Sequence, residues 1–404
     1  MPTITKGDKV LVSGANGYIA MWAVYLFLER GYSVRGTVRS EDKAKFMKDY
    51  FNSIGLGDKL ETFIVEDIVK EGAFDEAVKG VDAIAHMASP FHANVKDPEE
   101  FLRPAVQGTV GILKSAVKNG DKVKRVVITS SCASIMSPPD KPTKFSELDW
   151  NTLSPKQVEE QGSNTPPMTI YRASKTLAEK GAWEYHEKHK NEVQWDLAVI
   201  NPPFVSTLPR NFENPCWADK PFDDSTKEAL SDSNSWVDVR DTALGHVLAL
   251  EKSEAGGERI ITTEGGYIWQ EWLAAANSIS PSPISSHKLP VGHPEILDGT
   301  RVINISYDKS KEQRILGIKF HTKLETTKDT LEDFARRAIS KRDKVLVTGT
   351  NGYIAMWTER LLLERAVRGT VHSEVEAKSV KKYFASLGCG DRLKLAIVDN
   401  ISKV

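Results

Sequence analysis

Strand-type and helix-type segments alternate strictly from residue 9 to residue 201 of the chain. Buried strands have short, continuous apolar runs, whereas helices have apolar residues three and four positions apart. The strand-type segments cover 9–13, 33–38, 60–65, 83–88, 125–130 and 196–201, and the helix-type segments cover 18–30, 41–54, 74–78, 99–118 and about 171–188. This order predicts an α/β fold, a doubly wound parallel sheet with helices on both faces.

A glycine-containing loop joins the first strand segment to the first helical segment. Residues 14–20 read GANGYIA, with the spacing G-x-x-G-x-x-A. Gly14 allows a tight turn, Gly17 lets a pyrophosphate approach the backbone, and Ala20 lets the helix lie close to the sheet. A plain strand-to-helix turn also explains such a loop, but its place at the start of a βαβ series favours a dinucleotide. A helix N-terminus offers free N–H groups to phosphates, so the expected cofactor contacts here are Gly14, Gly17, Tyr18 and Ile19.

The end of the second strand segment bears on the choice between NADH and NADPH. NAD-preferring folds of this kind place an acidic residue there to bind the ribose 2′-hydroxyl. This chain has Arg39 at that point and Lys43 one helical turn later. Two cations suit a 2′-phosphate, so we expect NADPH, with a solvated basic helix start as the alternative. Asp67 and Ile68 follow the third strand segment, where they meet the adenine edge or form an Asx turn or helix cap.

Tyr171 and Lys175 lie four residues apart in a helical segment and therefore share one helix face. A free phenol has a pKa near 10, and a cation one turn away stabilises the phenolate and lowers that pKa. The spacing alone is common by chance. However, TSS at 129–131 follows the fifth strand segment, at the carboxyl end of the sheet where such folds bind ligands. A serine hydroxyl there can donate to a substrate carbonyl while Tyr171 gives the proton.

Taken together, these residues resemble the extended short-chain dehydrogenases/reductases, within them the dihydroflavonol reductase-like branch that includes fungal NADPH-dependent aldehyde/ketone and methylglyoxal reductases. The resemblance covers about residues 7–338 and rests on GANGYIA, HMASP (86–90), TSS, YRASK (171–175) and WVDVRD (236–241), in that order. It implies a Rossmann domain that binds NADP, a smaller mixed α/β substrate domain, and hydride transfer from NADPH to a small-molecule aldehyde or ketone.

The resemblance also implies roles for individual residues. The family's catalytic serine, tyrosine and lysine fall on Ser131, Tyr171 and Lys175, the serine being the second of the TSS pair. Gln107 stands where the family often has Asn or Glu, which puts a proton-relay role there in doubt. Residues 205–209 depart from the family's V-x-G-P, which puts substrate specificity in doubt. The remaining cofactor contacts that the resemblance implies are Arg39, Lys43, Ala88, Pro202 and Val205.

A second, incomplete copy of the beginning of the chain stands at its end. KVLVSGANGYIAMW at 9–22 returns as KVLVTGTNGYIAMW at 344–357. We therefore predict a Rossmann domain at 1–201 with a returning segment near 236–251, a mainly substrate-binding domain at 202–340, and a truncated duplicate at 341–404.

The duplicate is expected to form a partial βαβαβ unit without catalytic function. It keeps the loop residues Gly349, Gly352 and Ala355 but carries His372 in place of the first copy's phosphate-reading arginine. Asn400 replaces the aspartate after the third strand, and Ala366 alone replaces a three-residue turn. No counterparts of the catalytic serine, tyrosine and lysine follow.

Composition excludes several other classes of protein. The chain has 54 Lys and Arg against 55 Asp and Glu, so it lacks the basic surface of a nucleic-acid binder. It has no apolar run of the length that a membrane span needs, and its first residues lack the core of a secretory signal. Three scattered cysteines favour neither a disulfide framework nor a metal site, so we expect a cytoplasmic protein without metal. For its oligomeric state we expect a monomer or homodimer.

Two other functions fit the glycine loop. One is a nucleotide-sugar epimerase or dehydratase with NAD, which the two cations after the second strand disfavour. The other is a non-catalytic sensor of NADP, which would not need Ser131, Tyr171 and Lys175. The joint presence of these three residues favours the enzyme.

Overall fold

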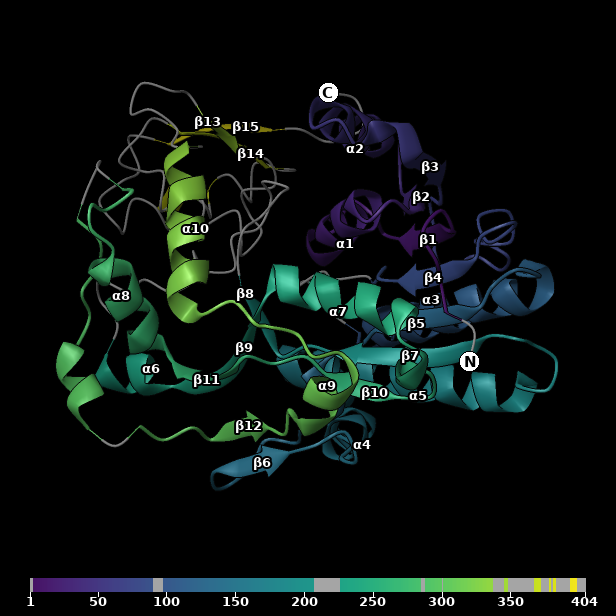
Figure 1. The fold of residues 1–404 in the computed structure, drawn as a ribbon. Coiled ribbons are helices and arrows are strands. Elements are labelled where there is room, and N and C mark those ends of the chain that lie inside the picture. The colour runs from purple at the N-terminus through teal and green to yellow at the C-terminus, as the bar shows by residue number, and fades with distance from the viewer. Residues whose placement is uncertain are drawn as a thin grey trace.

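The computed structural model describes residues 3–89, 97–206, 226–284, 288–299 and 301–336, together with 345–347, 367–371, 378, 381–382 and 393–397. Its centre is a seven-stranded sheet in the order β10-β7-β5-β4-β1-β2-β3, with every neighbouring pair parallel (Figure 1). The predicted doubly wound sheet is therefore confirmed. The strands are β1 (Lys9–Ser13), β2 (Ser33–Val38), β3 (Leu60–Ile64), β4 (Ala83–His86), β5 (Arg125–Thr129), β7 (Asp196–Asn201) and β10 (Arg259–Ile261).

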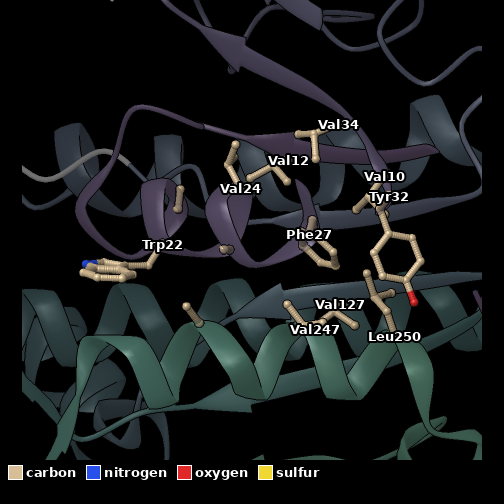
Figure 2. Packing of buried hydrophobic residues seen from close by; sticks show 14 of the residues in the cluster. Val10, Val12, Trp22, Val24, Phe27, Tyr32, Val34, Val127, Val247 and Leu250 are labelled. Atoms are coloured by element: carbon tan, nitrogen blue, oxygen red, sulfur yellow. The ribbon is translucent and has the colours of Figure 1, made fainter. Parts of the chain in front are cut away.

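Helices cover both faces of this sheet because successive side chains of each strand point to opposite faces. Val10 and Val12 of β1 belong to the core with α1 and α7, whereas Leu11 belongs to the core with α3 and α5. Figure 2 shows the first of these cores, where Phe27 of α1 lies between the sheet and Val247 of α7. The covering helices are α1 (Tyr18–Glu29), α2 (Glu41–Ser53), α3 (Glu99–Asn119), α5 (Pro167–His189) and α7 (Val239–Glu251).

The order of strands reverses between β1 and β4, which fixes where a ligand can lie. β1 leads to β2 and β3 on one side, and the chain then returns to β4 on the other side of β1. In open sheets of this kind, the crevice for a ligand lies outside the carboxyl ends of the strands at such a reversal. The loop after β1 and the residues after β4 are therefore neighbours at this edge.

The segment 74–78 is not a helix, contrary to the expectation from its apolar spacing. It forms hydrogen-bonded turns, with Val78 N–H donating to the carbonyl of Phe74 at 3.0 Å. Phe74 and Val78 are fully buried, so the apolar spacing of this segment reflects the buried side of a turn and not of a helix. The segment is bounded by Gly72 and Gly80, both with positive φ, and so short a helix does not offset its nucleation cost.

The polar, proline-rich stretch 138–167 contains two regular elements. β6 (Thr143–Phe145) pairs with β12 (Ile305–Tyr307), and α4 (Leu153–Gln161) follows it. α5 then begins at Pro167, four residues before the expected start, because proline is well suited to the first turn of a helix.

A smaller mixed α/β part stands beside the sheet. Its strands β8 (Phe204–Ser206), β9 (Ser233–Asp238) and β11 (Gly265–Ile268) pair in the order β11-β9-β8, with β9 antiparallel to β11 and parallel to β8. β9 continues directly into α7, which packs against the main sheet. The helices of this part are α6 (Lys227–Ser231), α8 (Trp269–Ser278), α9 (Ser310–Ile315) and α10 (Lys323–Arg336).

The end of the chain forms a separate three-stranded parallel sheet. β13 (Val345–Val347), β14 (Val367–Val371) and β15 (Leu393–Ile397) pair in the order β13-β14-β15 (Figure 1). β1, β2 and β3 stand in the same order in the main sheet. The residues of the duplicate that were compared with the first copy lie outside the described residues, both the retained ones and the changed ones: Gly349, Gly352, Ala355, Ala366, His372 and Asn400. In the described part of the chain, no helix combines the length and the apolar character that crossing a membrane requires.

Candidate active site

The loop after β1 requires its first glycine. Gly14 has φ of +61°, and a Cβ there would lie 2.9 Å from Cα of Ala88, the second residue after β4. The loop is also fixed to β2, because Ala15 N–H donates to the Thr37 carbonyl at 2.8 Å. At Gly17 a Cβ would lie 3.0 Å from the Gly14 carbonyl oxygen. At Gly14 and Gly17 the backbone is thus accessible to a ligand, because neither residue has a side chain.

The N-terminus of α1 is suited to bind an anion. Gly17 occupies the N-cap position and has no side chain with which to cap the helix, and the first turn of the helix contains no acidic residue. The N–H groups of the first turn are therefore left to an external acceptor at the positive end of the helix dipole. Tyr18 and Ile19 begin the helix and pack against the first core, as do Met87 after β4 and Val205 in β8. The start of α1, the residues after β4 and the strand β8 thus contribute to one continuous core.

Arg39 and Lys43 are both exposed beside this loop, Arg39 directly after β2 and Lys43 in α2. Within the described residues, neither forms an ion pair with a carboxylate. An exposed guanidinium without a protein partner can bind a phosphate through two parallel hydrogen bonds. The two side chains therefore suit the 2′-phosphate that the sequence analysis assigned to them.

Asp67 forms the Asx turn that was one of its two interpretations. Its Oδ1 accepts a hydrogen bond from Val69 N–H at 2.9 Å. Ile68 packs against α3 at Gly108, where a Cβ would lie 2.8 Å from Ile68 Cδ1. The turn leaves Asp67 exposed at the carboxyl end of β3, so it constrains the backbone there without excluding an adenine contact.

Lys175 lies at the carboxyl end of β4. Its Nζ donates to the Ser89 hydroxyl at 3.2 Å and lies 6.0 Å from the centroid of the Tyr171 ring. Burial lowers the pKa of the Lys175 ammonium to about 8, and the nearby carboxylate of Glu179 opposes that shift. Tyr171 packs edge-on against Phe101 of α3, with the ring centroids 6.4 Å apart. The helix that carries Tyr171 and Lys175 thus brings the lysine side chain to the carboxyl end of the sheet.

Ser131 is held at the carboxyl ends of β5 and β7. Its Oγ accepts from Ala133 N–H at 3.1 Å and lies 3.4 Å from the Pro202 carbonyl oxygen. Cys132 N–H donates to the same carbonyl at 2.9 Å. Ser131 and Pro202 therefore lie together, and the hydroxyl makes one long contact that a substrate carbonyl can replace.

The preceding serine is already engaged within the protein. Ser130 is buried, and its hydroxyl donates to Glu179 Oε2 at 2.5 Å. This distinguishes the two serines of the TSS motif, since only Ser131 is free of a carboxylate partner among its described contacts. The choice of Ser131, which the resemblance alone implied, thus has a physical reason in the contacts of Ser130.

A small cavity joins these elements, and it includes residues that sequence reasoning missed. The missed residues are Ser89, Thr109 and Glu179, and the full lining is Ala88, Ser89, Ala105, Thr109, Ile128, Thr129, Ser130, Lys175, Ala178 and Glu179. One signal was present for Glu179, which continues the four-residue spacing of Tyr171 and Lys175. Gln107 is exposed and lines a different cleft with Lys114, so the structure does not support a relay role for it.

Comparison with known proteins places this geometry among reductases. Residues 10–203 match the model of the NAD dependent epimerase/dehydratase family. The chain is 33% identical over 351 residues to the NADPH-dependent methylglyoxal reductase of Saccharomyces cerevisiae, covering 80% of this chain and 96% of that protein. It is 33% identical over 342 residues to a ketoreductase of Aspergillus niger, covering 77% of this chain and 93% of that protein.

The structure of the yeast methylglyoxal/isovaleraldehyde reductase complexed with NADPH has the same architecture. The two structures superpose with a TM-score of 0.72 at 32% identity, covering 81% of this chain and 98% of that chain.

Proposed function

The chain belongs to the NAD dependent epimerase/dehydratase family, and we propose that it reduces an aldehyde or ketone to the alcohol with NADPH. The observation that carries this proposal is the placement of Tyr171, Lys175 and Ser131 at one end of the sheet, next to a loop built for phosphates. Its fungal relatives, a methylglyoxal reductase and a ketoreductase, act on carbonyl compounds, which supports the same reaction class.

The residues present fit NADPH. The glycine loop and the uncapped end of α1 offer backbone N–H groups to a pyrophosphate, and the close contact of Gly14 with Ala88 leaves no room for a side chain. Arg39 and Lys43 would hold the 2′-phosphate, with Asp67 and Ile68 on the adenine side. Further contacts are expected from Ala88, Lys175, Pro202 and Val205, which all lie around the carboxyl end of the sheet.

Each catalytic residue has a distinct task. Bound NADPH supplies the hydride that reduces the carbonyl carbon. Ser131 donates a hydrogen bond to the carbonyl oxygen, where negative charge develops. Tyr171 then gives its phenolic proton to that oxygen. The positive charge of Lys175, one helical turn away, favours the phenolate that Tyr171 becomes.

The remaining assignments extend the same proposal. Residues 202–340 would supply most of the substrate-binding surface, on the strands and helices beside the main sheet. Residues 341–404 would take no part in catalysis. The protein would work as a monomer or homodimer in the cytoplasm, which agrees with the buried free thiol of Cys132.

The test is to mix the purified protein with NADPH or NADH and a panel of aldehydes and ketones, and to follow the nicotinamide absorbance. We expect oxidation of NADPH that requires a carbonyl compound and is much slower with NADH. No oxidation of either cofactor, together with conversion of a nucleotide sugar, would identify an epimerase or dehydratase instead. Tight NADPH binding without any turnover would identify a sensor.

A further inference from the structure

Glu179 is a buried acid directly beside the proposed catalytic residues. It lies on α5 one helical turn after Lys175, is 1% exposed, and lines the same cavity as that lysine. A carboxylate this deep in a protein is costly unless each oxygen has partners. The partners of its two oxygens show what this acid connects.

The first oxygen pairs with a buried arginine. Arg259 Nε at the start of β10 donates to Glu179 Oε1 at 2.5 Å. The guanidinium is fixed in turn, because its Nη1 donates to the Glu147 and Asp149 carbonyl oxygens at 2.8 and 2.9 Å. Its central carbon lies 3.6 Å from the centroid of the Trp150 ring. This setting fixes the orientation of the Glu179 carboxylate.

The second oxygen connects to the catalytic serine. Glu179 Oε2 lies 2.5 Å from the Ser134 hydroxyl and accepts from Asn201 Nδ2 at 2.9 Å. Both groups also reach the backbone carbonyl oxygen of Ser131, at 2.7 Å from Ser134 Oγ and 3.3 Å from Asn201 Nδ2. The Asn201 amide has two N–H groups and can donate to both oxygens, whereas the single hydroxyl proton of Ser134 is shared between them. Both side chains therefore link the carboxylate to the backbone of Ser131.

The same carboxylate is the acidic group that faces Lys175. From β4, His86 is fully buried, and burial lowers its pKa to about 3, so it is neutral and gives the lysine no counter-charge. From α3, Ala105 and Thr109 line the cavity, and α5 contributes Lys175, Ala178 and Glu179. Tyr171 lies on α5 one turn before the lysine, outside the lining of this cavity. The charge of Glu179 thus opposes the effect of burial on the ammonium group.

We propose that Glu179 is a positioning residue for the carbonyl reduction, which fixes Ser131 through Ser134 and Asn201 and keeps Lys175 protonated. This inference rests on the proposed function. It gives one buried group control over two of the three catalytic side chains, although it touches neither the substrate nor the cofactor.

The test compares Glu179→Gln with Asp196→Asn. Asp196 pairs with Arg125 at 2.5 Å and is also buried, but it lies at the opposite end of the sheet. Both variants lose one partner of a buried ion pair, so both are expected to melt at lower temperature. Only Glu179→Gln should lower kcat, by about 10–100-fold. It should also move the alkaline limb of the kcat profile down by on the order of half to one pH unit, since the lysine loses its counter-charge.

A second measurement does not depend on turnover. The affinity for NADPH can be followed by nicotinamide fluorescence across the same pH range. As the pH rises, this affinity should begin to fall at a lower pH in Glu179→Gln than in the wild type. Glu179→Asp retains the charge and should restore the alkaline limb. A folded Glu179→Gln protein whose two pH profiles match those of the wild type and of Asp196→Asn would overturn the proposal.

Two further outcomes remain distinguishable. If the wild type oxidises NADPH with no carbonyl compound, the proposed function is wrong, while the binding profiles still test the link between Glu179 and Lys175. If Glu179→Gln does not fold, Ser134→Ala tests the other link, because it removes the hydroxyl between the carboxylate and Ser131. We expect a several-fold lower kcat with an unshifted alkaline limb, and an unchanged kcat would contradict the positioning of Ser131.

Discussion

Lys175 reaches across the cavity from α5 and donates a hydrogen bond to Ser89, three residues after the end of β4, at 3.2 Å. The contact joins the helix that carries Tyr171 to the strand end beside the glycine loop. It also holds a positive charge at a partly buried position, which has consequences for both stability and catalysis.

Replacing this charge should stabilise the protein without its cofactor. The folded pKa of Lys175 is about 8, below its usual 10.5, so the charged form is disfavoured in the folded state. The penalty is complete below pH 8 and disappears as the pH rises from there towards 10.5. Lys175→Met should therefore raise the free energy of unfolding by about 1–3 kcal/mol at pH 7 while abolishing turnover. Urea denaturation at pH 7 and pH 10 checks this, and a gain of equal size at both values would contradict it.

Removing the phenolic hydroxyl should leave the fold intact and remove the proton donor. Tyr171→Phe keeps the ring that packs against Phe101. Turnover should fall about 10²–10⁴-fold, because the general acid is lost. The dissociation constant for NADPH should change little. Steady-state kinetics and a fluorescence titration separate the two effects, and near-normal turnover would exclude Tyr171 from the mechanism.

Arg39→Asp should change the preference between cofactors. Loss of two charge-assisted hydrogen bonds to a 2′-phosphate costs on the order of 2–4 kcal/mol, so KM for NADPH should rise sharply. Use of NADH should be unchanged or improved. Lys48→Asp makes a comparable charge change at an exposed position of α2 and serves as the control. Equal use of both cofactors by the wild type would remove the basis of this prediction.

The ion pair between His321 and Asp241 should make stability depend on pH. His321 Nδ1 lies 2.7 Å from Asp241 Oδ1, and this hydrogen bond raises the pKa of the histidine. The stabilisation is complete below the ordinary histidine pKa near 6.5 and is lost as the pH rises through the higher folded value. His321→Gln should therefore lose on the order of 1 kcal/mol at pH 6 and less at pH 9. Thermal melts at the two pH values test this, and an equal loss at both would refute it.

The terminal duplicate should be dispensable. Its three described strands, β13, β14 and β15, form a sheet of their own without pairing to the main sheet. Truncation after residue 340 should leave NADPH stoichiometry and reductase activity unchanged. Loss of a second equivalent of bound NADPH would reveal a functional second site. Collapse of activity without unfolding would show that the duplicate supports the catalytic part.

The sequence alone was enough to predict the strands of the central sheet other than β10, together with the residues proposed for chemistry. Residues 9–13, 33–38 and 196–201 were predicted as strands with the bounds that the structure has. The segments 9–13 and 196–201 each contain a short apolar run, which burial on both faces of a parallel sheet demands. The glycine loop and the spacing of Tyr171 and Lys175 could also be found from the sequence, because turns and helix faces are set by neighbours along the chain.

Only the tertiary structure decided which distant residues meet. The segment 74–78 was predicted to be a helix from its apolar spacing, but in the structure a series of turns buries the same side chains. The pairing of β6 with β12 joins segments about 160 residues apart in the chain, and no local period records it. Glu179 gathers Ser134, Asn201 and Arg259 around one carboxylate by packing of separate elements. Hydrophobic periodicity specifies the face that a segment buries, whereas the partners of a buried charge depend on the whole fold.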